Sequence, residues 1–484
     1  MTSQAEHPDV FHPTEQPPVP RGHPWIAWAA IVAVVAGLVA LRANTEIPGR
    51  QDVQHRLQSM AADFQARYFL GAANLFQQKE SEALLASAAV GRGPIGERLR
   101  YVVLLGELQG PKAAAEKLKK LADPLHGTGA KEDRDAADVL DRLYGDLTEG
   151  KTTLPSIGPE DRQRLVERLG WSGRLALHPA GGTDLKERDA LLAAARQTVI
   201  RSLASFGIGA IAVLAGLVAL AVIVLLLLAR PQSRALPQST GHGGIYAETF
   251  AVWIVTYITL GYSARCLSLE QHPFLLSAAV MFVSLATLGW PVLRGVPWQT
   301  VRQDVGLHLG RKPLVELLLG PVAYLAALPL AIGGLLIVAA LMVFTHRLPN
   351  AGGGELAPDR MPYHPVVGWL LEGDWWEKVQ VVFLASVMAP LMEETLFRGF
   401  LHRQLRDATH RLGYVGSVLA SGLTTSFVFA AIHPQGWIAI PALMGLALAF
   451  TLAREWRGTL LPAMIAHGLN NGLLTCVFIS MGSG

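Results

Sequence analysis

The chain has 484 residues, of which 51% are hydrophobic and only 16% are charged, and its mean hydropathy is +0.32. This composition is too apolar for an ordinary soluble protein and predicts an all-α, polytopic helical membrane protein. The net charge of +3 is small, and the cationic residues are scattered, so a nucleic-acid partner is not expected. Cys266 and Cys476 are the only cysteines, which excludes a disulfide framework and a cysteine-based metal site.

The first 44 residues divide into two parts. Residues 1–24 are rich in Pro and His with few apolar side chains, which predicts a disordered tail. The run from Trp25 to Leu41 is uncharged and long enough to cross a hydrocarbon core about 30 Å thick. It could equally be the core of a signal peptide, but the preceding tail is not basic and no small-x-small cleavage pattern follows promptly. We therefore expect an uncleaved signal-anchor transmembrane helix over 25–44.

Residues 45–197 are densely charged and carry helical patterning, as in QDVQHRLQSMAADFQARYFLGAANLF. Gly and Pro residues punctuate the segment at 110–111, 127–129 and 156–159, which suggests helix pairs. A tetratricopeptide-like array would require a fixed period, and none is found. The sequence therefore predicts a soluble all-helical domain, either a plain bundle or a spacer.

From residue 198 onward the chain is mostly apolar. Eight further uncharged runs lie at about 202–229, 249–264, 273–293, 317–345, 379–392, 412–432, 436–453 and 459–481. With the signal anchor they give about nine spans, which we divide into transmembrane helices over 198–374 and a transmembrane core over 375–484.

The distribution of Lys and Arg predicts the orientation of these spans. If the amino terminus is cytoplasmic, the connections on that side hold eleven Lys and Arg residues, and those on the other side hold four: Arg265, Arg347, Arg360 and Lys378. Positive charge favours the cytoplasmic side, and long domains are exempt from the count. We therefore expect a cytoplasmic amino terminus and an extracytoplasmic domain at 45–197.

Two adjacent carboxylates, Glu393 and Glu394, interrupt the apolar run VVFLASVMAPLMEETLFRGF. A charge at membrane depth is costly, so the pair predicts a functional site. Arg398 follows one helical turn after Glu394 on the same face, where the two can pair and lower their desolvation cost. Glu393 is turned about 100° away and is the carboxylate left to act on a water or a metal.

Two histidines lie in equally apolar surroundings, His433 in SFVFAAIHP and His467 in MIAHGLNNG, and Asn471 follows one turn after His467. A carboxylate and an imidazole converging on one water form a general-base pair, and a nearby His and Asn can donate to an oxyanion. Glu393, His433 and His467 also form a ligand set that zinc accepts, although no H-E-x-x-H pattern is present. The residues alone leave both mechanisms open.

Each of these residues also has a structural interpretation. Glu394 and Arg398 could be an ion pair that locks a helix, and His433 could be a satisfied interhelical histidine before a helix end at Pro434. Asn471 could join packed helices. Four such polar positions within about 80 residues of a very apolar region nevertheless favour a joint function.

Depth counting poses a difficulty for this site. At about 1.5 Å per residue, Glu393 lies about 15 Å and His467 about 12 Å from the predicted cytoplasmic face, whereas His433 lies about 27 Å away. A tilted or late-starting helix after Gly413, or a re-entrant connection at 434–436, is needed to bring the three together.

Three ordered motifs carry a family resemblance: E-E-T-L-F-R at 393–398, F-A-A-I-H at 429–433 and H-G-L-N-N at 467–471. Residues 375–481 thereby resemble the CAAX prenyl protease and bacteriocin-processing family of intramembrane endopeptidases. The resemblance implies that Glu393 and His433 activate the attacking water, that Glu394 and Arg398 organise the site, that Phe429 packs beside it, and that His467 and Asn471 stabilise the oxyanion. This mechanism requires no cofactor; zinc is the alternative.

The expected activity is hydrolysis of a peptide bond in a membrane-associated or prenylated-like peptide, in the cell membrane of a prokaryote. The expected partners are that peptide and the lipid bilayer, and the helical domain at 45–197, which the family core does not ordinarily contain, is a candidate for binding a further protein. A non-catalytic peptide-binding or bacteriocin-immunity protein on the same fold is the alternative. A transporter is disfavoured because the polar positions cluster in the final third of the chain.

Overall fold

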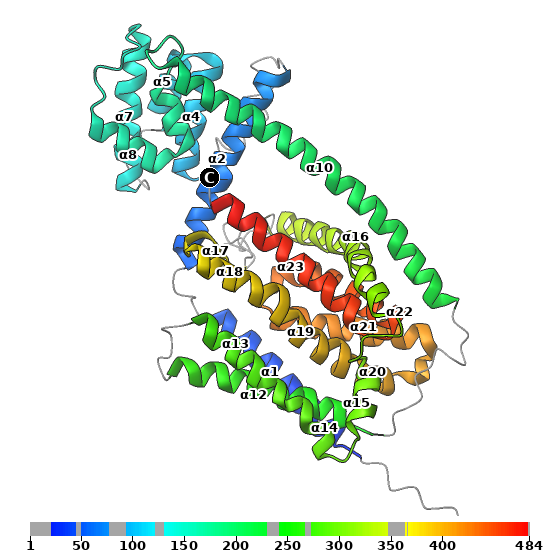
Figure 1. The fold of residues 1–484 in the computed structure, drawn as a ribbon. Coiled ribbons are helices and arrows are strands. Elements are labelled where there is room, and N and C mark those ends of the chain that lie inside the picture. Colours follow the sequence, from blue (N-terminus) through cyan, green and yellow to red (C-terminus); the bar gives the residue numbers. More distant parts are fainter. Residues whose placement is uncertain are drawn as a thin grey trace, which may run out of the picture. The chain divides into compact units, whose positions relative to one another are not determined.

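The computed structural model describes residues 21–44, 50–76, 93–121, 130–229, 242–266, 273–346, 364 and 366–482, and every regular element within these ranges is a helix (Figure 1). Nearly all of the predicted tail over 1–24 lies outside the described residues. The prediction of an all-α, polytopic membrane protein is confirmed.

Eight helical segments of the described chain are long and apolar enough to cross a membrane: Pro24–Leu41, Leu185–Leu228, Pro273–Leu293, Pro313–Phe344, Trp375–Ala408, His410–Ile432, Trp437–Arg457 and Leu461–Met481. The sequence predicts a ninth over 249–264. That run is helical, as part of α12 (Ile245–Cys266), but it is not among the eight. Its Thr, Tyr and Gly residues lower its mean hydropathy, and Glu248 lies in its first turn.

The chain divides into two compact units, one formed by Ile47–Ile211 and the other by Met1–Glu46 together with Ala212–Gly484. The first unit contains, in chain order, α2 (Arg50–Phe76), α4 (Ile95–Gln109), α5 (Pro111–Lys119), α7 (Lys131–Thr148), α8 (Pro159–Leu169), α9 (Trp171–Leu177) and the start of α10 (Leu185–Leu228). The sequence predicts a domain end near residue 197, but α10 is a single 44-residue helix that continues through this point.

Glycine and proline set the helix boundaries of this first unit. Pro111 and Pro159 each begin a helix directly after a glycine, because a first-turn residue needs no backbone N–H. Gly110 has φ of +88°, a conformation that residues with a side chain rarely adopt, and it separates α4 from α5. The Gly and Pro residues at 110–111 and 156–159 therefore do mark helix ends, whereas those at 127–129 lie outside the described residues.

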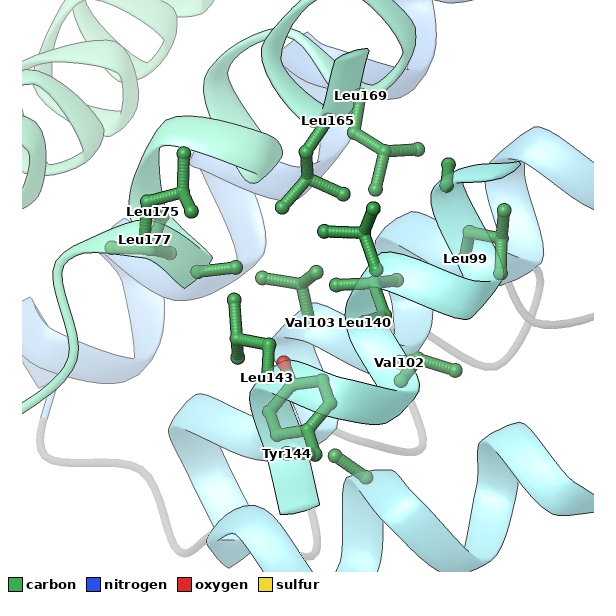
Figure 2. Close-up of a cluster of buried hydrophobic side chains, with 14 of the residues drawn as sticks. Leu99, Val102, Val103, Leu140, Leu143, Tyr144, Leu165, Leu169, Leu175 and Leu177 are labelled. Atoms are coloured by element: carbon green, nitrogen blue, oxygen red, sulfur yellow. The ribbon is translucent and has the colours of Figure 1, made fainter. Parts of the chain in front are cut away.

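Apolar side chains from several helices meet in the centre of this unit, as Figure 2 shows. Helix α7 contributes Leu140, Leu143 and Tyr144, while Leu99 comes from α4 and Leu165 from α8. On α7 the buried apolar positions fall on one side of the helix, and most of the charged residues lie between them. This amphipathic pattern explains why the charge-rich segment folds as a bundle with its own core.

The second unit contains the remaining helices. In chain order they are α1 (Pro24–Asn44), α12 (Ile245–Cys266), α13 (Pro273–Ser284), η2 (Leu285–Gly289), α14 (Trp290–Leu293), α15 (Trp298–Val305), α16 (Pro313–His346), α17 (Val366–Glu372), α18 (Trp375–Phe383), η3 (Leu384–Met388), α19 (Ala389–Glu393), η4 (Glu394–Leu401), α20 (His402–Ala408), η5 (His410–Leu412), α21 (Gly413–Ile432), η6 (Trp437–Ala439), α22 (Ile440–Arg457) and α23 (Leu461–Gly482). Helices α16, α21, α22 and α23 form a packed group, which is visible in Figure 1.

Small residues permit close contact within this group. A side chain on Gly334 would lie 2.3 Å from the backbone oxygen of Pro441, and one on Gly445 would lie 2.3 Å from that of Leu330. Helix association in a membrane depends on such packing, since lipid removes the hydrophobic driving force between helices. Helices α16 and α22 are therefore fixed against each other along their length.

A second core of the same unit joins α1 and α12 to η4. Ala27 and Ile31 of α1 are buried in it, and the ring of Tyr246 packs edge-on against Phe400 at 5.6 Å. The predicted signal-anchor helix thus packs on α12 as part of this core.

Truncating Leu140 tests the core of the Ile47–Ile211 unit. Leu140 has no exposed surface, so Leu140→Ala should leave a cavity and lower the free energy of unfolding of this unit by about 2 to 5 kcal/mol. Hydrogen-exchange mass spectrometry of the full chain should show faster exchange across α7. Asp141→Ala, on the exposed face of the same helix, should leave that exchange unchanged; equal effects of the two changes would contradict the core assignment.

Candidate active site

The segment that carries the paired carboxylates starts with a capping box. Asp374 accepts a hydrogen bond from the amide of Glu377 at 2.8 Å, and the Glu377 carboxylate accepts one from the amide of Asp374 at 2.9 Å. From there α18, η3, α19, η4 and α20 follow one another without a break, and η3 and η4 are π-helical. Single π-helical turns inside longer helices are frequent at functional sites.

The backbone explains why η3 needs an external partner. The amide of Ala389 donates to the carbonyl of Leu384, so the next π-helical donor, to Ala385, would be residue 390. That residue is Pro390, which has no N–H. Asn471 of α23 supplies the missing donor, with its Nδ2 2.9 Å from the carbonyl oxygen of Ala385.

Glycine allows α23 to approach η3 this closely. A side chain on Gly468 would lie 2.4 Å from the carbonyl oxygen of Ser386, and one on Gly472 would lie 3.2 Å from the Ser386 hydroxyl. The motif H-G-L-N-N therefore includes residues that seat α23 on the π-helical turn. This fits the interpretation of Asn471 as a residue that joins packed helices, and it uses one of its two amide hydrogens.

The predicted ion pair is present in the structure. Oε1 of Glu394 lies 3.0 Å from Nη1 of Arg398, and neither side chain has exposed surface. The Arg398 guanidinium also donates to the carbonyl of Ala447 at 3.2 Å. It lies over the rings of Phe429 and Phe450, 4.6 and 5.6 Å from their centres. The charge is thus balanced by a carboxylate, a carbonyl and two π faces.

Both histidines converge on the first carboxylate. Nε2 of His433 is 3.9 Å and Nε2 of His467 is 3.8 Å from the same atom, Oε2 of Glu393. That oxygen is buried and has no hydrogen-bond partner within the described residues. The side chain of Glu393 as a whole is 18% exposed, whereas that of Glu394 is fully buried. Of the two carboxylates, only Glu393 has exposed surface.

The convergence removes the depth difficulty for His433. Helix α21 ends at Ile432, and only the residues from His433 to Gly436 separate it from η6. His433 is consequently a helix-end residue that points to Glu393, whichever level the start of α21 occupies. The three side chains therefore lie together, and the unequal depths counted from the sequence do not separate them.

The partners of each ring fix the positions of its protons. Nδ1 of His433 lies 2.6 Å from the carbonyl oxygen of Phe429, which can only accept, so that nitrogen carries a hydrogen. Nδ1 of His467 lies 2.8 Å from Oε1 of Glu394 and donates in the same way. In the neutral rings both Nε2 atoms therefore hold lone pairs. Either ring can donate from Nε2 only after it takes up a second proton.

The net charge of the site indicates what a second proton on one of the rings would do. Glu393, Glu394 and Arg398 together leave one negative charge if both rings are neutral. One additional proton, on either ring, balances it. His467 lies against both carboxylates and is stacked on Phe450 with ring centres 5.2 Å apart. A second proton on either ring would therefore face the Glu393 carboxylate.

Zinc was the alternative occupant of this set of three donors. The chemistry fits, because each ring gives its other nitrogen to a carbonyl or carboxylate, as zinc-binding histidines commonly do. The distances of 3.8 and 3.9 Å from Oε2 of Glu393 to the two Nε2 atoms are longer than the roughly 3.3 Å between ligand atoms that lie about 2.0 Å from a tetrahedral zinc. In the described part of the chain no three His, Cys, Asp or Glu residues form a ligand shell.

Some residues of the site were not expected from the sequence. Phe450 stacks on His467, and Ala447 accepts from Arg398, but both lie in an ordinary apolar run without a polar signal. The aromatic partner that the resemblance did name, Phe429, packs on His433 with ring centres 4.1 Å apart.

A second buried polar cluster was also missed. His402 has no exposed surface, and its Nε2 lies 2.9 Å from Oε1 of Glu455, which also accepts from Arg406 at 3.2 Å. From the sequence, no ionisable residues outside the first site were expected to lie at such depth. Position 402 lies in LHRQLRDATHR, and such a high density of charged residues is typical of a solvated helix end. The four-residue spacing of His402 and Arg406 was the available signal.

Comparisons with known proteins agree with the motifs. Residues 375–473 match the model of the Rce1-like family of type II CAAX prenyl endopeptidases. The protein described as membrane-embedded CAAX protease MroQ, from Staphylococcus aureus strain USA300, is 31% identical over 93 residues, which are 19% of this chain and 37% of MroQ. No solved structure matches the chain. The resemblance is thereby confirmed for this segment, although the match spans little more than a third of the relative.

Removal of the buried guanidinium tests the role of the ion pair. Arg398→Ala leaves Glu394 charged and unpaired by Arg398 in an apolar interior, which should lower the free energy of unfolding by about 3 to 5 kcal/mol. The monodisperse yield after detergent extraction and the apparent Tm should both fall. The double change of Glu394→Leu and Arg398→Met should be more stable than Arg398→Ala. If the double change is the less stable of the two, the unpaired charge is not the cause.

Proposed function

We propose that this integral membrane protein is an intramembrane endopeptidase that hydrolyses a peptide bond with a water activated by Glu393 and His433. The observation that carries the proposal is the convergence of both Nε2 atoms on Oε2 of Glu393, a buried oxygen without a partner in the described chain. Three atoms that can accept hydrogen bonds surround one point, and a water molecule is a donor small enough to satisfy two of them. This is the arrangement that a general base requires.

The reaction proceeds in two steps. A water held by Glu393 and His433 loses a proton to Glu393 while its oxygen attacks the peptide carbonyl carbon, and the carbonyl π bond breaks to give a tetrahedral oxyanion. The proton then passes from Glu393 to the leaving amine nitrogen as the C–N bond breaks. His467 stabilises the oxyanion from Nε2 when its ring carries the second proton, and the remaining amide hydrogen of Asn471 is a further donor.

Glu394 and Arg398 do not take part in proton transfer in this mechanism. Glu394 orients His467 through the hydrogen bond to Nδ1, and Arg398 neutralises Glu394. Because both side chains are fully buried, substrate cannot reach them. They position the groups that act.

The substrate class that we propose is a peptide held at the membrane, prenylated or otherwise attached, and cleaved near the cytoplasmic leaflet of a prokaryotic cell membrane. Support comes from the similarity to MroQ, which is described as a CAAX protease, and from the excess of Lys and Arg in the connections on the predicted cytoplasmic side. The helical unit Ile47–Ile211 lies outside the matched segment, and we propose that it binds a further protein.

The replacement of Glu393 tests the assignment of the base. Glu393→Gln keeps the shape of the side chain but removes its basicity, so cleavage of a fluorogenic farnesylated CAAX peptide and of its unprenylated form in proteoliposomes should cease. Folded yield and Tm should match the wild type. Glu132→Gln, which removes an exposed carboxylate from α7, should leave cleavage intact.

The same pair of proteins separates catalysis from simple binding. A peptide-binding or immunity protein should retain the captured peptide, uncleaved, with both the wild type and Glu393→Gln. Full activity of Glu393→Gln would contradict the assignment of Glu393, and absence of cleavage by the wild type on both peptides would favour the binding alternative.

Metal removal tests the choice of a mechanism without zinc. If zinc were bound, Glu393, His433 and His467 would hold it, and it would lower the pKa of a bound water. We expect activity to withstand 1,10-phenanthroline and the purified protein to contain less than one zinc per chain by mass spectrometry. Loss of activity with chelator and its recovery with added zinc would contradict this expectation.

A further inference from the structure

Helix α12 lies outside the segment that matches the family, yet it runs antiparallel to the helix that carries Glu393. The amide of Ala247, near the start of α12, donates to the side chain of Gln404 at 3.3 Å. Farther along α12, Phe250 packs edge-on against Phe397 with ring centres 5.1 Å apart. Residue numbers therefore rise along α12 as they fall along the facing helix.

This register predicts the residue of α12 that faces the first carboxylate. Trp253 packs edge-on against Phe397 at 5.9 Å. One turn farther along α12 is Tyr257, and one turn back along the facing helix from Phe397 is Glu393. In agreement, Tyr257 lies within electrostatic range of Glu393. Tyr257 and Glu393 thus lie at corresponding levels of the two helices.

Within the described residues, the contacts of the Tyr257 side chain are made by its aromatic ring. Its ring stacks on that of Trp253, with centres 5.7 Å apart and planes 25° apart, and Trp253 is itself buried. Within the described residues the Tyr257 hydroxyl has no hydrogen-bond partner. Tyrosine hydroxyls in apolar surroundings usually find one. An unpaired donor at the level of Glu393 points to an acceptor that the substrate brings.

A count of donors shows why the reaction needs one more. His433 and His467 can donate from Nε2 only when they carry a second proton, because Phe429 and Glu394 already engage Nδ1 of each ring. Asn471 already donates one of its two amide hydrogens to the carbonyl of Ala385. The site is therefore rich in acceptors and poor in donors at the moment when an oxyanion forms.

We propose that the Tyr257 hydroxyl donates a hydrogen bond to the oxyanion of the tetrahedral intermediate, as a catalytic residue contributed from outside the segment 375–473. The proposal rests on the proposed endopeptidase function. Because a phenol donates whether or not a neighbouring histidine is protonated, it supplies the donor that the two rings lack in their neutral state. No bond to Tyr257 forms or breaks during the reaction.

The test compares Tyr257→Phe with the wild type on the farnesylated peptide in proteoliposomes. Phenylalanine retains the ring that stacks on Trp253 and removes only the hydroxyl. Loss of one oxyanion donor lowers kcat by about 100-fold to 1,000-fold. We expect this loss with KM and Tm unchanged, and with the same factor at every pH at which the wild type is active. Tyr262→Phe, on an exposed tyrosine of the same helix, should have wild-type kinetics.

Each other outcome is decisive. If Tyr257→Phe keeps kcat within about threefold of the wild type while Glu393→Gln is inactive, the role of Tyr257 is wrong and the endopeptidase function stands. A matching fall in Tm would assign Tyr257 to packing and would also overturn the proposal. If the wild type cleaves no more peptide than Glu393→Gln, the proposed function fails and this inference fails with it.

Discussion

The ion pair of Glu394 and Arg398 is the interaction on which the site depends. A lone charge in an apolar helix bundle would be prohibitively costly. Here Arg398 pairs with Glu394 and also contacts a backbone carbonyl and two aromatic faces, and Glu394 accepts a hydrogen bond from His467. Because the guanidinium is tied to α22 and the carboxylate to α23, the pair fixes three helices in relation to one another. The convergence on Glu393 follows from that geometry.

A backbone constraint acts beside the electrostatic one. Pro390 removes the donor that would complete η3, and Asn471 replaces it from another helix. Helix α23, which approaches through Gly468, therefore completes the hydrogen bonding of the π-helical turn in the segment with the carboxylates. A residue that the motif alone would assign to chemistry thus also completes the hydrogen bonding of a helix.

The sequence predicted the class of fold, the ion pair and the residues that meet at Glu393, because charge in an apolar run is a strong and local signal. It did not predict the His402 and Glu455 cluster, since the charges around position 402 resemble an ordinary helix end. It likewise missed Phe450, Ala447 and Tyr257, which are apolar or aromatic residues among many others. Their roles arise from packing between helices far apart in the chain, and no pattern within one helix encodes such contacts.

The aromatic contacts between α12 and η4 have a consequence for engineering. Phe250 and Trp253 pack on Phe397, and Tyr246 packs on Phe400, so residues 375–473 take part of their aromatic packing from outside the segment. In a chimera that carries residues 375–473 on another scaffold, Phe397 and Phe400 would lose the aromatic side chains of α12 that pack on them. Transplantation of this module therefore has to include the α12 face as well.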